Sequence, residues 1–294
     1  MFYRRKVILA LLEIFGGELD KIRLQKLLFL LTLDQQKPEY QFIPYKYGCY
    51  SYSASADMLA MANKNILREI KEYIAKVDDI SYFKQLKPSD QAVLRKVKAK
   101  YGDMDTRALM KYTYVNYPFF ATRSEVAAEI LDDDELERVK DSKANSQTTA
   151  LFTIGYEGIS LEEYLVRLLK NDVKVLVDVR NNPLSMKYGF SKSQLKRYCE
   201  SLGIKYVHIP EVGIQSLQRK QLTTQADYDK LFAVYRKENL PTTITAQITI
   251  LNLLKENKRI ALTCFESNIC QCHRKHLAEA IQNLPGFKYT LEHI

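Results

Sequence analysis

Three of the five cysteines and two of the four histidines of this chain lie in the segment TCFESNICQCHRKHLAEA, from Thr263 to Ala280. Thiols and imidazoles this close together can bind a metal, react as nucleophiles or line an anion pocket. A zinc site would draw its ligands from Cys264, Cys270, Cys272 and His273 or His276. The spacing C-x5-C-x-C-H lacks the paired C-x2-C pattern of common zinc sites, so the sequence does not favour zinc.

Two other interpretations of this segment are open. A helix is expected to begin near Cys272, and the first helical turn lowers a thiol pKa, which makes Cys272 the candidate for a reactive thiolate. A sulfur-transfer loop of the rhodanese type, however, contains glycine, and this segment has none. In the interpretation that we favour, Cys264 and Cys272 pack as small apolar residues. His273 and Arg274 then face an anion at the helix N-terminus, beside Glu266.

Polar and ionisable residues also follow the other strands that the second half of the sequence predicts. Because the carboxyl ends of parallel strands meet at one edge of a sheet, we expect these side chains to share a cavity. Glu157, Asp178 and Glu266 are the predicted acid–base or nucleophilic groups. The residues predicted to bind an anion or the rest of the substrate are Tyr156, Arg180, Ser185, Lys187, Glu211, His273 and Arg274.

The spacing of apolar residues indicates which elements hold these side chains. After residue 149 the sequence alternates between strands and helices, and the expected strands are ALFTIGY, VKVLVDVR, IKYVHIP, RIALTCFE and FKYTLEHI. This alternation predicts right-handed crossovers and a parallel sheet. We therefore expect a Rossmann-like α/β domain over residues 150–294.

The first part of the chain has a helical pattern instead. Apolar residues at helical spacing predict two helices before residue 34 and further helices over residues 53–63, 89–101, 105–114 and 124–131. The segment NILREIKEYIAKV fits a helix or a hairpin equally well. We expect residues 1–140 to form a mainly helical domain of the winged-helix kind, which binds DNA or a partner protein. A polar linker, residues 141–149, follows it.

Composition limits the classes of protein and partner. The apolar runs stop far short of the roughly 20 residues that span a bilayer, and the N-terminus does not resemble a signal peptide, so we expect a cytoplasmic protein. The 44 Lys and Arg exceed the 35 Asp and Glu by 9. Residues 1–147 contribute +3 (24 against 21) and residues 148–294 contribute +6 (20 against 14). This surplus favours anionic partners, although it also fits a solubility charge.

Three segments of the second half resemble a known family. They are TIGYEGISLEEYL, VLVDVRNNPLSMKYGFSKSQLKRYCESLGIKYVHIPEVG and ALTCFESNICQCHRKHLAEAI. In this order they are similar to the domain of unknown function 488 family, from about Leu151 to Leu284. The visible departure is Val212-Gly213-Ile214, where the family more often has Leu-Gly-Gly. The resemblance implies an α/β domain related to rhodanese-like sheets and no settled activity.

The N-terminal segments IRLQKLLFL and FIPYKYGCYS also resemble a family pattern. They are similar to the SocA-like antitoxin and phage-associated (Panacea) domain family, over about Arg4 to Leu67. Cys49 stands where that pattern usually has proline. The resemblance implies a helical domain that occurs beside toxins and DNA-handling proteins, as a partner of DNA or of protein.

Taken together, these residues predict an enzyme that acts on a nucleic acid or nucleotide, by hydrolysis or by glycosyl or phosphoryl transfer. In this hypothesis Arg180 and Arg274 hold phosphate. One alternative is a non-catalytic DNA-binding or toxin–antitoxin protein with an α/β sensor domain. Another is a zinc-dependent or cysteine-dependent sulfur-transfer protein. The sequence identifies no cofactor.

Overall fold

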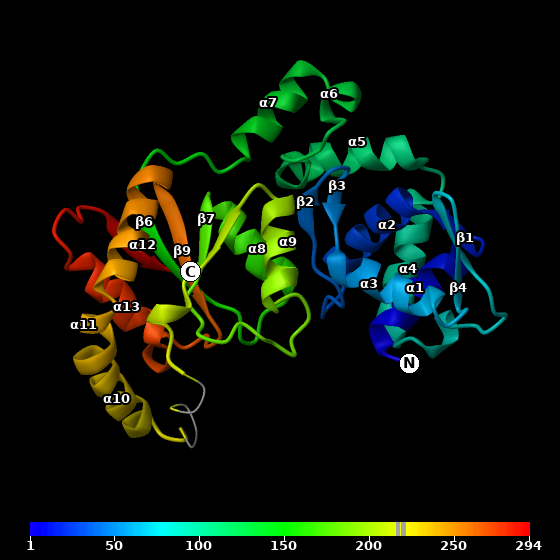
Figure 1. Cartoon of the computed structure of the whole chain (residues 1–294). Helices are drawn as coiled ribbons and strands as arrows, with labels where there is room; N and C mark the ends of the chain where they lie inside the picture. Colours follow the sequence, from blue (N-terminus) through cyan, green and yellow to red (C-terminus); the bar gives the residue numbers. More distant parts are fainter. Residues whose placement is uncertain (216–217, 219–221) are drawn as a thin grey trace. The chain divides into compact units, whose positions relative to one another are not determined.

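The structure, a computed structural model, describes residues 1–215, 218 and 222–294. The chain divides into two compact units, Met1–Lys143 and Ala144–Ile294 (Figure 1). The division falls within the polar segment that separates the helical and the alternating parts of the sequence. Among the described residues, no helix has both the length and the apolar character that crossing a bilayer requires.

The first unit is built from helices, a small sheet and a hairpin. Strands β1 (Glu18–Asp20), β5 (Tyr73–Lys76) and β4 (Leu67–Ile70) form an antiparallel sheet in that order, and β2 (Ile43–Tyr45) pairs with β3 (Gly48–Tyr50). The segment that fitted a helix or a hairpin is therefore the hairpin β4–β5. The helices are α1 (Tyr3–Ile14), α2 (Lys21–Asp34), α3 (Tyr52–Ala62), η1 (Phe83–Gln85), α4 (Pro88–Tyr101), α5 (Thr106–Asn116), η2 (Pro118–Ala121), α6 (Ala127–Ile130) and α7 (Asp133–Asp141).

The first two helices supply the centre of this unit. Every residue from Val7 to Leu12 in α1 is fully buried, which is expected of a helix that is apolar on all sides. Helix α2 begins at a capped position, because the Asp20 carboxylate accepts a hydrogen bond from the Arg23 backbone N–H at 2.8 Å.

Two polar side chains of α2 hold the turn that leads into α3. Gln25 Oε1 accepts a hydrogen bond from the Ser51 backbone N–H at 3.0 Å, and Lys26 Nζ donates to the Cys49 carbonyl at 3.1 Å. Both side chains line a cavity of about 540 Å³. These contacts connect the two sequence segments, IRLQKLLFL and FIPYKYGCYS, that form the N-terminal pattern.

The buried Lys26 ammonium leads to a prediction about pH. Burial lowers the pKa of Lys26 below its usual value. The unfolded chain therefore binds more protons than the folded chain at pH values between the lowered pKa and about 10.4, and in that window stability rises with pH. We expect Lys26→Met to remove this rise, as measured by urea unfolding at several pH values. The exposed Lys84 supplies the control Lys84→Met, and an equal pH slope in all three proteins would contradict the prediction.

The second unit alternates strands and helices. Its strands are β6 (Ala150–Gly155), β7 (Val175–Asp178), β8 (Lys205–His208), β9 (Arg259–Cys264) and β10 (Thr290–His293). Its helices are α8 (Leu161–Lys170), α9 (Lys192–Ser201), η3 (Pro210–Val212), α10 (Gln225–Val234), η5 (Tyr235–Asn239), α11 (Leu240–Thr242), α12 (Ile244–Asn257), η6 (Ile269–Gln271) and α13 (His273–Gln282). The predicted strands are all present, and the Ser160 side chain caps α8 by accepting from the Glu163 backbone N–H.

The strands form one parallel sheet in the order β10-β6-β9-β7-β8. Helices α8 and α9 cover one face and helices α12 and α13 cover the other (Figure 1). All residues of β6, β7 and β9 are buried, because these central strands have helices on both faces. The prediction of an α/β domain with a parallel sheet is therefore confirmed.

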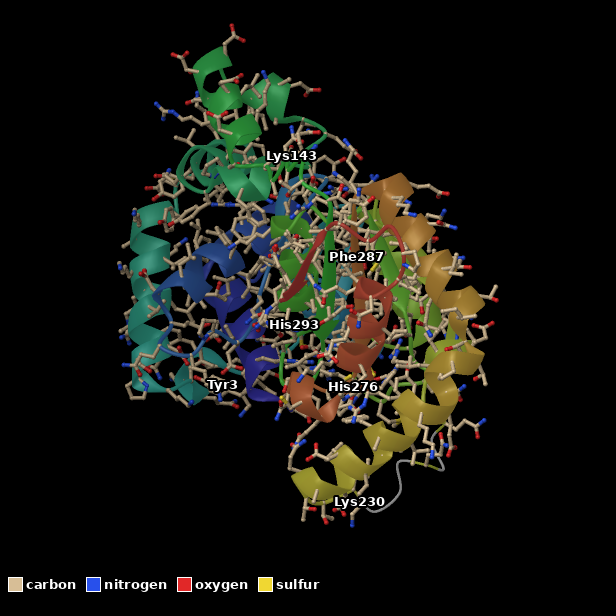
Figure 2. The ribbon with its side chains drawn as sticks, turned by 90° about the vertical axis from the view of Figure 1, so that its left-hand side faces the viewer. Tyr3, Lys143, Lys230, His276, Phe287 and His293 are labelled. Atoms are coloured by element: carbon tan, nitrogen blue, oxygen red, sulfur yellow. The ribbon has the colours of Figure 1, made fainter. Side chains whose placement is uncertain are left out.

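The last strand returns to the edge of the sheet beside the first strand of this unit. β10 pairs with β6 in parallel, from Thr290 beside Ala150 to His293 beside Thr153. His293, labelled in Figure 2, lies with its Nδ1 atom 2.7 Å from Thr153 Oγ1. The carboxyl ends of the strands consequently meet at one edge, where polar residues of the sequence were expected to gather.

Candidate functional site

A cavity of about 350 Å³ lies at the carboxyl edge of the parallel sheet. Residues that follow β6, β7 and β9 form most of its wall, which is the usual position of a ligand in an open parallel sheet. Ile214, which comes after β8, completes it. The lining residues are Tyr156, Arg180, Asn181, Asn182, Leu184, Ser185, Met186, Ile214, Cys264, Phe265 and His273.

A buried ion pair fixes one side of this cavity. Arg180 donates from Nε to one oxygen of the Asp178 carboxylate at 2.8 Å and from Nη2 to the other at 2.5 Å. The Arg180 backbone N–H and the Tyr206 hydroxyl also donate to Asp178, at 3.1 and 2.5 Å. Both carboxylate oxygens are thus engaged, and the Asp178 side chain is fully buried. The predicted catalytic role of Asp178 is therefore not supported, because its oxygens serve the protein.

Arg180 also holds the aromatic wall of the cavity. Its Nη1 donates to the Tyr156 hydroxyl at 2.7 Å and to the Phe190 carbonyl at 2.9 Å. The rings of Tyr156 and Phe190 are stacked, with centroids 4.3 Å apart, and Lys187 Nζ donates to the Tyr156 carbonyl at 2.6 Å. Because its donors point to protein groups, Arg180 positions this wall, and we withdraw its predicted role as a phosphate clamp.

The orientation of His273 can be derived from its two contacts. Its Nε2 lies 3.1 Å from the Val179 carbonyl, which can only accept a hydrogen bond, so Nε2 carries the proton. In the neutral ring Nδ1 then has a lone pair. Nδ1 lies 3.6 Å from Cys264 Sγ. The fold therefore directs a basic nitrogen at a thiol, and both residues line the cavity.

A second thiol belongs to the same group. The ligand atoms of Cys264, Cys272 and His273 all lie within 4.8 Å of one another, and the three residues are buried. Burial raises the pKa of the Cys272 thiol well above its usual value, and a hydrogen bond with Cys264 raises it further. The expectation that the helix start activates Cys272 is wrong, because desolvation dominates. Cys270 is exposed and lies outside this group.

Charged side chains also brace the loop between β9 and α13. Arg274 is buried and donates from Nη1 to the Glu266 carbonyl and from Nη2 to the Ser267 carbonyl, so it does not face an anion as predicted. The exposed Glu157 carboxylate accepts from the Ser267 backbone N–H at 3.0 Å. A Cβ atom on Gly155 would lie 2.0 Å from the Glu266 carbonyl oxygen, so only glycine allows this approach. Both Glu157 and Arg274 thus hold the loop.

The comparison with known families covers the residues that line this cavity, apart from Tyr156. Residues 160–281 match the model of the family "Domain of unknown function DUF488". No curated protein matches the chain. The DUF488 match includes Arg180, Cys264, Cys272 and His273, and it confirms the resemblance that the second half of the sequence indicated. It does not reach the first unit, where the similarity to SocA-like antitoxins stays a prediction.

Within and beside the DUF488 segment, the structure brings together part of the predicted site. Glu211 is exposed in η3 after β8. Glu266 is partly buried, and its Oε2 lies 3.3 Å from Sγ of Cys264, a residue of the cavity wall. The predicted residues that line the cavity are Tyr156, Arg180, Ser185, Cys264 and His273. Those outside its described lining are Glu157, Asp178, Lys187, Glu211, Glu266, Cys270, Cys272 and Arg274.

Several lining residues had not been assigned a role from the sequence. Asn181 and Asn182 follow β7 directly, so the same rule that selected Asp178 and Arg180 would have found them. Phe265 is 43% exposed at the end of β9, between Cys264 and Glu266. The partner of Asp178, Tyr206, sits inside β8, and no sequence signal distinguishes it from a core tyrosine.

Proposed function

We propose that the second unit is a hydrolase that acts on a nucleotide or on a nucleotide unit of a nucleic acid. The observation that carries the proposal is the cavity at the carboxyl edge of the sheet, with Cys264 and His273 in its wall and the Glu266 carboxylate beside them. Sites of this kind, concave with a few converging ionisable groups, are where catalysis takes place in α/β proteins. We also propose that the parallel sheet is of the Rossmann-like type.

The substrate class follows from the size and the lining of the cavity. A volume of about 350 Å³ suits a group the size of a nucleoside. The amides of Asn181 and Asn182 can pair with the edge of a base, and the exposed ring of Phe265 offers a stacking surface. The surplus of 20 Lys and Arg over 14 Asp and Glu in residues 148–294 favours an anionic substrate.

Among the three predicted carboxylates, Glu266 is the one that we assign to the acid–base step. Asp178 is bonded to Arg180 and Tyr206, and Glu157 is bonded to Ser267. Glu266 Oε2 accepts from Cys264 Sγ at 3.3 Å, and Cys264 is part of the cavity wall, so Glu266 is the carboxylate whose partner lies in the wall. A carboxylate there removes a proton from the attacking water and returns it to the leaving group.

Turnover of a defined panel tests this function. The full chain is incubated with nucleosides, nucleoside monophosphates and short single-stranded oligonucleotides, and the products are separated and weighed by mass spectrometry. Release of a base, of phosphate or of ammonia identifies which bond is hydrolysed. We expect one of these products. The absence of all of them across the panel, with metals and reductant supplied, would overturn the proposal.

For the first unit we propose a winged-helix module with one insertion. The elements α1, β1, α2, α3, β4 and β5 follow the order such modules use, with β1, β5 and β4 in an antiparallel sheet, and the β2–β3 hairpin is inserted between α2 and α3. Helix α3 contains no Lys or Arg, and the β4–β5 hairpin presents the exposed cations Arg68 and Lys71, which we propose contact the phosphate backbone. We expect weak duplex binding by the full chain that falls with salt and with Arg68→Glu/Lys71→Glu. Equal binding by this variant in an anisotropy titration would exclude the hairpin as a DNA contact.

A further inference from the structure

The group formed by Cys264, Cys272 and His273 has the chemistry of a metal site. Two thiols and one imidazole converge with their ligand atoms within 4.8 Å, and all three residues are buried. Thiolate and imidazole ligands together select zinc over magnesium or calcium, which prefer oxygen. Cys264 ends the central strand β9, while Cys272 and His273 begin helix α13, so two rigid elements position the three ligands.

The distance between two of the ligand atoms agrees with tetrahedral zinc. Bonds of about 2.3 Å to sulfur and about 2.0–2.1 Å to nitrogen, at a tetrahedral angle, place the two ligand atoms about 3.6 Å apart. Cys264 Sγ and His273 Nδ1 are 3.6 Å apart. A thiol–imidazole hydrogen bond fits the same separation, and Cys272 in turn has a hydrogen bond with Cys264. A metal ion would replace both bonds and engage all three ligand atoms at once.

The surroundings of His273 also match those of a metal ligand. A ligating histidine usually donates its other ring N–H to a carbonyl or a carboxylate, which fixes the ring and the tautomer. His273 donates from Nε2 to the Val179 carbonyl at 3.1 Å, and this contact leaves the lone pair of Nδ1 on the side of the two thiols. The protein thus prepares the nitrogen that a metal would use.

We propose that Cys264, Cys272 and His273 bind one zinc ion, whose fourth coordination position opens to the cavity. Cys264 and His273 are both part of the cavity wall, so a water molecule or a substrate atom can reach that position. Three protein ligands with one open position are typical of catalytic zinc. Binding converts two thiols to thiolates, so each zinc ion taken up releases up to two protons. This proposal stands on the ligand geometry and does not depend on the substrate proposed above.

The proposal is tested by metal content and by cobalt spectroscopy of the full chain. Protein purified under reducing conditions is stripped with a chelator, loaded with Zn²⁺ or Co²⁺, and freed of excess metal. We expect about one equivalent of zinc per chain, proton release on loading, and the thiolate-to-cobalt charge-transfer absorption of a tetrahedral site. Failure of the folded wild-type chain to take up zinc or cobalt would overturn the proposal.

Matched variants assign the ligands and separate this proposal from the proposed hydrolase. Cys272→Ala is expected to lose the charge-transfer band and most of the zinc, whereas Cys270→Ala, which changes an exposed cysteine in the same loop, keeps both. Circular dichroism checks that both variants fold. Equal metal loss in the two variants would reject the ligand set, and alkylation of Cys264 at the same rate with and without bound zinc would show that Cys264 is not a ligand. If the zinc-loaded chain turns over no member of the panel, the metal-site proposal stands and the hydrolase proposal is rejected.

Discussion

The Glu266→Gln variant is expected to turn over the substrate that the panel identifies about 10²–10⁴-fold more slowly than the wild type, which is the usual contribution of a general acid or base. Glutamine keeps the size and hydrogen-bonding reach of the side chain but cannot take up a proton. The Glu266 carbonyl still receives Arg274, so the loop keeps its anchor. Substrate affinity should change little, and stopped-flow or quenched single-turnover assays separate the chemical step from binding.

Glu157→Gln is the matched control for this experiment. Glu157 is a carboxylate at the same edge of the sheet, but it is exposed and accepts hydrogen bonds from Ser267. An amide oxygen can accept the same bonds, so we expect turnover within a few-fold of the wild type. If Glu157→Gln loses activity while Glu266→Gln keeps it, the acid–base role passes to Glu157 and our assignment of Glu266 is wrong.

Much of the second unit could be predicted because its elements follow local rules. The apolar runs of β6, β7 and β9 are those of strands buried on both faces, and Ser160 caps the helix that it precedes. Ligands gather at the carboxyl ends of parallel strands, and this rule predicts the edge of the sheet at which the cavity lies. The position of β9 between β6 and β7 is a long-range property of the sheet, and no local pattern encodes it.

The roles of individual site residues were harder to predict, because they depend on pairings across the fold. Asp178 and Arg180 stand two residues apart, and the sequence cannot tell whether the arginine turns to the carboxylate or to a ligand. Burial, which the local sequence does not show, also changes the pKa of a side chain. Cys272 stands at a helix start, which favours a thiolate, but its complete burial raises the thiol pKa instead. The approach of Cys264 to His273 needs the loop between β9 and α13 to fold back, which spacing alone does not show.

Removal of the Arg180 side chain is expected to destabilise the second unit strongly. In Arg180→Met the buried Asp178 side chain loses both bonds to the guanidinium. Breaking a buried ion pair by removing one partner costs about 3–5 kcal/mol, because the remaining charge is left without compensation. The aromatic wall also loses the bonds from Arg180 to Tyr156 and Phe190. Calorimetry of the full chain should show the transition of the second unit at a lower temperature and that of the first unit unchanged.

Two further variants distinguish loss of the pair from loss of packing. Arg167→Met removes a partly exposed arginine that pairs with Glu163 within α8, and i,i+4 helix pairs contribute about 0.3–0.5 kcal/mol. The double variant Asp178→Asn/Arg180→Met removes the uncompensated charge, so it should be less destabilised than the sum of its single variants. Strict additivity in this cycle would show that the pair carries no coupling energy. Arg180 would then act through packing alone, and the ion pair would not be what holds the cavity wall in place.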